Sequence, residues 1–208
     1  MVKPRLRGVS HQYAFYVALA AGAALVVLAR GGEARLAVGV YALSLSAMFG
    51  ASALYHRIDW SPGPRAWLRR LDHSMIFVLV AGTYTPFAVL VLAPALGWTV
   101  LAVVWGGALA GVVISVLWID APRWLTALLY VALGWVSIFT MPQLWDRAGW
   151  LAVALLATGG LLYTAGAVVY ARRRPDPAPR VFGYHEVFHV LVIAAAAVHF
   201  AAVAVYAI

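Results

Sequence analysis

Two histidines and a glutamate stand close together near the C-terminus, in the stretch His185-Glu186-Val187-Phe188-His189. Histidines four residues apart lie on one face of a helix, where both imidazoles can bind the same metal ion. The same H-E-x-x-H spacing occurs in zinc peptidases, in which the glutamate is the general base. The stretch is consistent with a peptidase site, a different zinc site or a chance feature of the composition, and the pattern alone does not decide among them.

A second group of polar residues can complete such a site. Ser52 and His56 are also four residues apart, and Asp72 stands just before another hydrophobic stretch. The chain has no cysteine, so any zinc must be bound by histidines and carboxylates. Three imidazoles and one carboxylate are the donor set of a catalytic zinc, with one position left for water.

The elements that must position these residues are membrane helices. The chain has 208 residues, of which 65% are hydrophobic and only 11% are charged, and this excludes an ordinary water-soluble domain. A helix needs about 20 apolar residues to cross a bilayer. Seven stretches meet that requirement: 12–29, 36–56, 73–93, 97–118, 124–141, 150–170 and 183–207. We therefore expect an all-α membrane protein, a seven-transmembrane helix bundle that forms a single domain over residues 1–208.

The positive charges predict the orientation of this bundle. If the N-terminus is cytosolic, twelve of the fifteen lysines and arginines lie on the cytosolic side, and only Arg30, Arg35 and Arg147 lie opposite. The twelve are Lys3, Arg5, Arg7, Arg57, Arg65, Arg69, Arg70, Arg123, Arg172, Arg173, Arg174 and Arg180. The positive-inside rule then places the N-terminus in the cytosol and the C-terminus outside. We therefore expect the basic residues behind the net charge of +8 to face anionic lipid headgroups of the plasma membrane. Nucleic acid is not expected as a partner.

This topology brings the candidate ligands together. The second span ends, and the third and seventh spans begin, on the cytosolic side, within about 10 Å of the same interface. We therefore predict one metal site formed by His56, His185 and His189, with Asp72 and Ser52 beside it. Each residue alone has a structural alternative, such as a capping role for His56 or Asp72 at a helix end.

The three other histidines are not expected to bind the metal. His73 is about 100° around the helix from Asp72, His11 precedes the first span and is expected at the interface, and His199 lies about 15 Å deeper than His189. In the third span, residues 82–86 (GTYTP) are expected to interrupt the helix, either as a structural kink or as the wall of a cavity for an acyl chain.

Four stretches carry a resemblance to a known family: SALYH, RRLDHSMIFVLVAGTYTPF, LLYVALGW and FGYHEVFHVLVIAAAAVHF. They resemble the hemolysin III family, within the larger progestin and adipoQ receptor group. The resemblance implies a seven-helix membrane protein with zinc bound by His56, His185 and His189. It also implies that Asp72 holds water at the metal and that Ser52 lies close by. Glu186 departs from the eukaryotic receptors, which tend to have a neutral residue there, so it stays a second candidate base.

The resemblance further implies ceramidase-like hydrolysis of a lipid amide or ester, linked to membrane homeostasis. We therefore expect a zinc-dependent hydrolase with Asp72 as the catalytic base and Ser52 assisting. One alternative is a non-enzymatic sensor of the membrane state in which zinc is structural. Another is a cytolytic, pore-forming protein, suggested by the family name alone. A peptidase is disfavoured because the H-E-x-x-H stretch lies in the last span, so the third ligand must come from upstream, at His56.

Overall fold

The computed structural model describes residues 3–207, and its regular elements are all helical. They are α1 (Val9–Leu28), α2 (Gly32–Arg57), α3 (Pro62–Leu90), α4 (Pro94–Leu117), α5 (Arg123–Gly134), the 3-10 helix η1 (Trp135–Thr140), α6 (Met141–Arg172) and α7 (Tyr184–Ala207). Among the described residues, six segments are long and apolar enough to cross a membrane, and one of them is the 50-residue segment Arg123–Arg172. The expected stretches 124–141 and 150–170 both fall within this segment.

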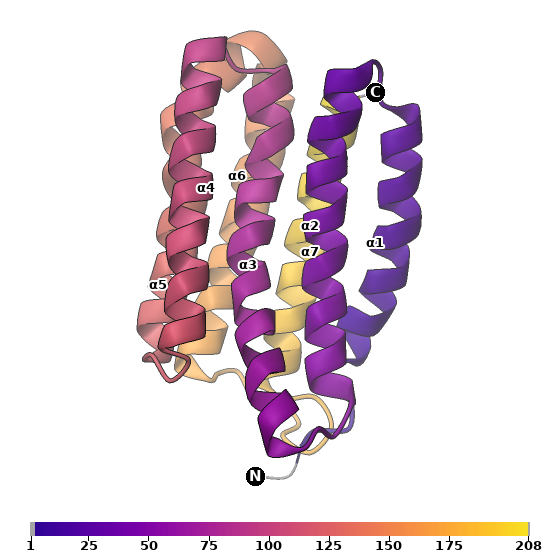
Figure 1. The fold of residues 1–208 in the computed structure, drawn as a ribbon, viewed down its shortest axis with the longest axis vertical. Helices are drawn as coiled ribbons and strands as arrows, with labels where there is room; N and C mark the ends of the chain where they lie inside the picture. Colours follow the sequence, from indigo (N-terminus) through magenta and orange to yellow (C-terminus); the bar gives the residue numbers. More distant parts are fainter. Residues whose placement is uncertain (1–2, 208) are drawn as a thin grey trace.

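The helices run alongside one another as a bundle, and α1 begins at the opposite end from that at which α7 finishes (Figure 1). The helix α2 packs between α1 and α3, and α7 contacts α1, α2, α3 and α6. Residues on α2 such as Val38, Tyr41 and Phe49 are almost fully buried, because this helix is covered on several sides. The interior of the bundle therefore forms around α2, α3 and α7.

The outer surface of the bundle is apolar. Large aliphatic side chains such as Val17, Leu36, Leu109 and Leu117 are more than 65% exposed, which water would penalise and lipid would not. Long apolar helices with exposed aliphatic side chains are the features of a multi-pass membrane protein.

Prolines stand in the first turns of α3 and α4, and arginines lie in the part of α3 that precedes its apolar stretch. Both α3 and α4 have a proline in the first turn, where the missing N–H is not needed. The expected span began at residue 73, but α3 begins eleven residues earlier, at Pro62. This extension carries arginines that find partners near the bundle end: Arg69 pairs with Asp120, and Arg70 Nε donates to the carbonyl of Val116 in the last turn of α4. Charged residues thus continue the helix beyond the apolar stretch.

The expected interruption of α3 at residues 82–86 is wrong, because α3 is continuous through Pro86. Thr83 and Tyr84 of this stretch do line a cavity, as the other reading of the stretch expected. The hydroxyl of Thr83 donates to the carbonyl of Leu79, and that of Thr85 donates to the carbonyl of Ala81. These bonds lie one turn back along the helix and do not replace the bond to Gly82 that Pro86 cannot make. The helix α2 packs closely against this turn.

Gly82 allows that close packing, and we expect Gly82→Ala to destabilise the protein. An added Cβ would lie 2.0 Å from Ser44 Oγ and 2.7 Å from Ser44 Cβ on α2. Overpacking of this kind costs roughly 1–3 kcal/mol. The matched control is Gly39→Ala, because a Cβ there meets nothing within 4 Å. Thermal unfolding in detergent should show a lower midpoint for Gly82→Ala only, and equal midpoints would contradict the prediction.

Candidate metal centre

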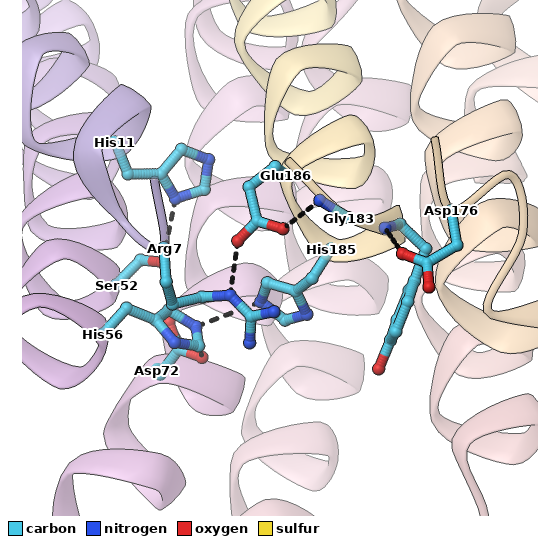
Figure 2. A network of polar contacts seen from close by, with 10 residues as sticks. Arg7, His11, Ser52, His56, Asp72, Asp176, Gly183, His185 and Glu186 are labelled. Atoms are coloured by element: carbon cyan, nitrogen blue, oxygen red, sulfur yellow. Dashed lines mark hydrogen bonds and ion pairs between the residues drawn. The ribbon is translucent and has the colours of Figure 1, made fainter. Parts of the chain in front are cut away.

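The predicted site residues lie at the end of the bundle where α2 ends and α3 and α7 begin. Figure 2 shows Ser52, His56, Asp72 and His185 among them. One ligand atom each from His56, His185 and His189 lies within 4.8 Å of the other two. His56 Nε2 and His185 Nε2 face each other at 3.1 Å. His56 and His189 are 7% and 1% exposed and His185 is partly buried, so the cluster is largely shielded from solvent.

The spacing of these nitrogens fits a tetrahedral metal ion. With metal–nitrogen distances of 2.0–2.1 Å and tetrahedral angles, two ligand nitrogens stand about 3.3 Å apart. The 3.1 Å pair is close to that separation, and the third ligand atom lies within 4.8 Å of both. Three imidazoles from two helices, in a chain without cysteine, are a donor set that suits zinc.

Asp72 and Ser52 lie where a carboxylate and a hydroxyl can act beside the metal position. Asp72 Oδ2 is 3.7 Å from His56 Nε2, and both Asp72 and Ser52 line the same cavity as His185 and His189. The Ser52 hydroxyl is 3% exposed, and its oxygen lies 2.8 Å from Nδ1 of His11. The structure therefore brings all five predicted residues to one place.

Two carboxylates cap the first turn of α7, and this capping explains the presence of a glutamate at position 186. Glu186 Oε2 accepts the backbone N–H of Gly183 at 2.8 Å, and Asp176 Oδ1 accepts that of Tyr184, also at 2.8 Å (Figure 2). A glutamate that reaches back three residues in this way is half of a capping box, and it also favours the positive end of the helix.

The other oxygen of Glu186, Oε1, pairs with the guanidinium of Arg7, which precedes α1 (Figure 2). Both oxygens are thus engaged, and Glu186 is not among the residues that line the cavity. The structure gives no support to Glu186 as a second base. The capping role and the ion pair instead explain why a carboxylate is present between the two histidines.

The segment before α1 closes this end of the bundle. The backbone N–H groups of Arg5 and Leu6 donate to the carbonyls of Arg180 and Val181 in the loop before α7. Lys3 pairs with the exposed Asp59, and its hydrogen bond and positive charge lower the pKa of that carboxyl. Gly8 has a φ of 76°, and a Cβ there would lie 2.7 Å from His56 Cβ. The N-terminal segment is therefore packed directly against a candidate ligand.

His11 is the residue that the sequence analysis missed. It was expected at the membrane interface, but it is only 2% exposed, and its ring stacks on His189 with 3.7 Å between centroids and 9° between planes. The signal was present in the predicted topology, because the first span begins at the same interface as the other ligands. The depth that places the ligands of the second, third and seventh spans at this interface applies equally to α1.

The two remaining histidines lie outside the cluster, as expected. His199 Nε2 is 3.2 Å from the carbonyl of Leu156, and its ring occupies the space left by Gly159 on α6. His73 follows Asp72 but does not belong to the group of three that can share an ion. Both line the cavity at other points.

A cavity of about 150 Å³ leads from the histidines into the bundle. Along α3 its walls extend from Asp72 to Ala88, roughly 24 Å at 1.5 Å per residue. Most of the wall is apolar, with side chains such as Leu79, Leu144 and Val192. One end of the cavity is thus polar and holds the candidate site, and the rest suits a hydrocarbon chain.

We expect Arg7→Ala to destabilise the protein strongly, because it leaves Glu186 charged and buried with a side chain that is only 2% exposed. Removing one partner of a buried ion pair costs about 3–5 kcal/mol, whereas replacing both can be neutral. The double variant Arg7→Met/Glu186→Gln should therefore regain most of the thermal midpoint in detergent. Equal thermal midpoints for wild type and Arg7→Ala would show that the Arg7–Glu186 ion pair does not hold the N-terminal segment in place.

The chain has relatives among known proteins. The family model described as "Haemolysin-III related" matches residues 1–200. The chain is similar to Hemolysin-3 of Bacillus cereus, with 32% identity over 84% of this chain and 76% of that protein. It is also similar to the Hemolysin-3 homolog of Bacillus subtilis strain 168, with 30% identity over 81% of this chain and 76% of that protein. A shorter match, 36% identical over 40% of this chain and 42% of the relative, is to the heptahelical transmembrane protein ADIPOR2 of rice, Oryza sativa subsp. japonica.

Proposed function

Because the chain belongs to the haemolysin-III-related family, within the progestin and adipoQ receptor group, we propose that it is a zinc-dependent hydrolase of a lipid amide or ester. The observation that carries the proposal is the continuity of the cavity. Its polar end is lined by Asp72, His185 and His189, and the same space continues between apolar side chains. A substrate with a polar head and an acyl chain fits such a shape.

The proposal includes seven passes through the plasma membrane, with the N-terminus in the cytosol. The segment Arg123–Arg172 would measure about 75 Å as one straight helix, more than twice the 30 Å bilayer core. Gly149 within it has φ 78° and ψ 177°, a non-helical conformation at which the chain can reverse. Two passes of this segment make seven in all. The printed name of the rice relative, heptahelical, supports the same number.

Zinc is the proposed metal, held by His56, His185 and His189. The donor set supports it, since three imidazoles without thiolates and with an open fourth position are typical of catalytic zinc. When bound, zinc supplies a Lewis acid that polarises a carbonyl and lowers the pKa of water toward about 7.

Asp72 is the proposed general base. Its Oδ2, 3.7 Å from His56 Nε2, is near enough to the metal position to accept a proton from the attacking water and return it to the leaving amine or alcohol. Ser52, which lines the same cavity, is placed to donate its hydroxyl proton to Asp72 or to the developing oxyanion. The apolar cavity would bind the acyl chain and keep bulk water out.

The alternative function is a sensor or regulator of the membrane in which zinc is structural. The short distance from Asp72 to His56 favours it, because a carboxylate in that position can also serve as the fourth ligand and close the site. A pore is less well supported, since the cavity walls offer ions few polar groups.

The function is tested with purified, zinc-loaded protein in lipid nanodiscs. Ceramides, other N-acyl lipids and acyl esters are offered, and released fatty acid is measured by mass spectrometry. We expect wild type to hydrolyse at least one class and His189→Ala to lose activity by about 100-fold or more. His73→Ala is the control, because it removes a neighbouring histidine outside the cluster. Absence of zinc-dependent turnover of any of these lipids would eliminate the enzyme and leave the structural alternative.

A further inference from the structure

His11 contacts two parts of the candidate site, and nothing in the proposed chemistry uses it. Its ring lies flat on the ring of His189, with centroids 3.7 Å apart, and the edge of Phe49 on α2 meets it at 5.0 Å between centroids. Its Nδ1 lies 2.8 Å from Ser52 Oγ. One buried side chain from α1 therefore touches a candidate ligand on α7 and a candidate catalytic hydroxyl on α2.

The contact with His189 restricts the orientation of a ring that no hydrogen bond fixes among the described residues. A metal-binding histidine usually has its ring fixed by a hydrogen bond from the nitrogen that does not bind the metal. His189 Nδ1 has no such partner among residues 3–207. The flat stack against His11, itself wedged by Phe49, restricts rotation of the His189 ring in place of that hydrogen bond.

The contact with Ser52 determines to which acceptor the Ser52 hydroxyl can donate its hydrogen. A neutral imidazole carries one N–H, and His11 Nε2 is buried without a partner in the part of the chain that the structure describes. If Ser52 donated to Nδ1, the N–H would sit on Nε2 as a buried donor without an acceptor, which is the costlier arrangement. We therefore assign the N–H to Nδ1, donating to Ser52 Oγ. This leaves the Ser52 hydrogen free for an acceptor in the cavity that Ser52 shares with Asp72.

We propose that His11 is a positioning residue of the metal centre, which fixes the His189 ring by stacking and directs the Ser52 hydroxyl by hydrogen bonding. The two roles belong to different parts of the side chain, so they can be separated. His11→Phe keeps a flat ring and removes the hydrogen bond. His11→Asn keeps a donor near the position of Nδ1 and removes the ring. The part that concerns Ser52 rests on the proposed hydrolysis, and the part that concerns His189 does not.

The metal part is tested with cobalt as the probe, because tetrahedral Co²⁺ has absorption bands that report ligand geometry. We expect His11→Asn to weaken Co²⁺ binding by about 10–100-fold in chelator competition, the usual effect of losing an outer support, and to change the visible spectrum. His11→Phe should bind Co²⁺ within about threefold of wild type, with an unchanged spectrum. Phe49→Leu, which loosens the same ring from α2, should give a smaller loss in the direction of His11→Asn.

The hydroxyl part is tested by kinetics on a hydrolysed lipid. His11→Phe should lower kcat by about 10–100-fold without raising KM, because substrate binding in the apolar cavity is unaffected. A purely structural His11 would instead lower the thermal midpoint of both variants and leave the Co²⁺ spectrum of the folded protein unchanged. A folded His11→Asn or Phe49→Leu with wild-type Co²⁺ affinity and spectrum would overturn the proposal. If wild type hydrolyses no lipid, the proposed function fails and the cobalt measurements still decide the role of His11.

Discussion

Alanine at His56, His185 and His189 together is expected to abolish zinc binding. Wild type purified without chelator should retain about one equivalent of zinc, and the triple variant almost none, because the ligand atoms that lie within 4.8 Å of one another have been removed. Each single variant should weaken zinc affinity by more than about 100-fold, beyond what loss of an outer support costs. The measurements are metal analysis by mass spectrometry and competition with a chelator.

The control for this prediction is His73→Ala. His73 also lines the cavity and immediately follows Asp72, but it is outside the group of three histidines. Its zinc content should equal that of wild type. A triple variant that still carries zinc would mean that the ion lies elsewhere, and the proposed hydrolase and its structural alternative would both lose their basis.

Replacement of Asp72 by Asn is expected to reduce the hydrolytic kcat by about 10²–10⁴-fold while zinc stays bound. The amide has nearly the same shape but cannot accept the proton of water. This loss corresponds to about 3–5 kcal/mol of transition-state stabilisation. The matched control is Asp59→Asn, which removes an exposed carboxylate beyond the end of α2 that pairs with Lys3 and does not line the cavity.

The same variant distinguishes catalysis from a structural clamp. If Asp72 binds the metal directly, Asp72→Asn should weaken zinc affinity and lower the thermal midpoint. If Asp72 acts on water, zinc content and stability should hardly change and only turnover should fall. Full activity of Asp72→Asn would exclude Asp72 as the base, and Ser52 would then be the next residue to replace.

The arrangement of the site connects the membrane fold to the proposed chemistry. The three histidines and Asp72 come from helices that all have an end at the same side of the bundle, so a ligand set is assembled without any long loop (Figure 1). The cavity then runs along α3 toward the other side. A lipid that is already in the bilayer would need to move its reacting carbonyl only a short way from the headgroup region.

Several features could be predicted from the sequence because they depend on composition and local spacing. Apolar stretches of about 20 residues must be helical in a bilayer, since their backbone groups have no other partners there. The alternation of helix direction then brings His56, Asp72 and His185 to one interface, however the helices pack. The pairs Ser52 with His56 and His185 with His189 follow from the helical repeat alone.

The tertiary structure decided what depends on contacts between distant segments. The sequence pattern made Glu186 a candidate base, and only its contacts with Gly183 and with Arg7, 179 residues away, identify it as a capping and ion-pairing residue. Likewise, the continuity of α3 through Pro86 and the close approach of Gly82 to Ser44 are seen only in the structure. His11 belongs to the site because α1 packs beside α2 and α7. Neighbour relations between helices arise from side-chain packing, which residue spacing along one helix does not encode.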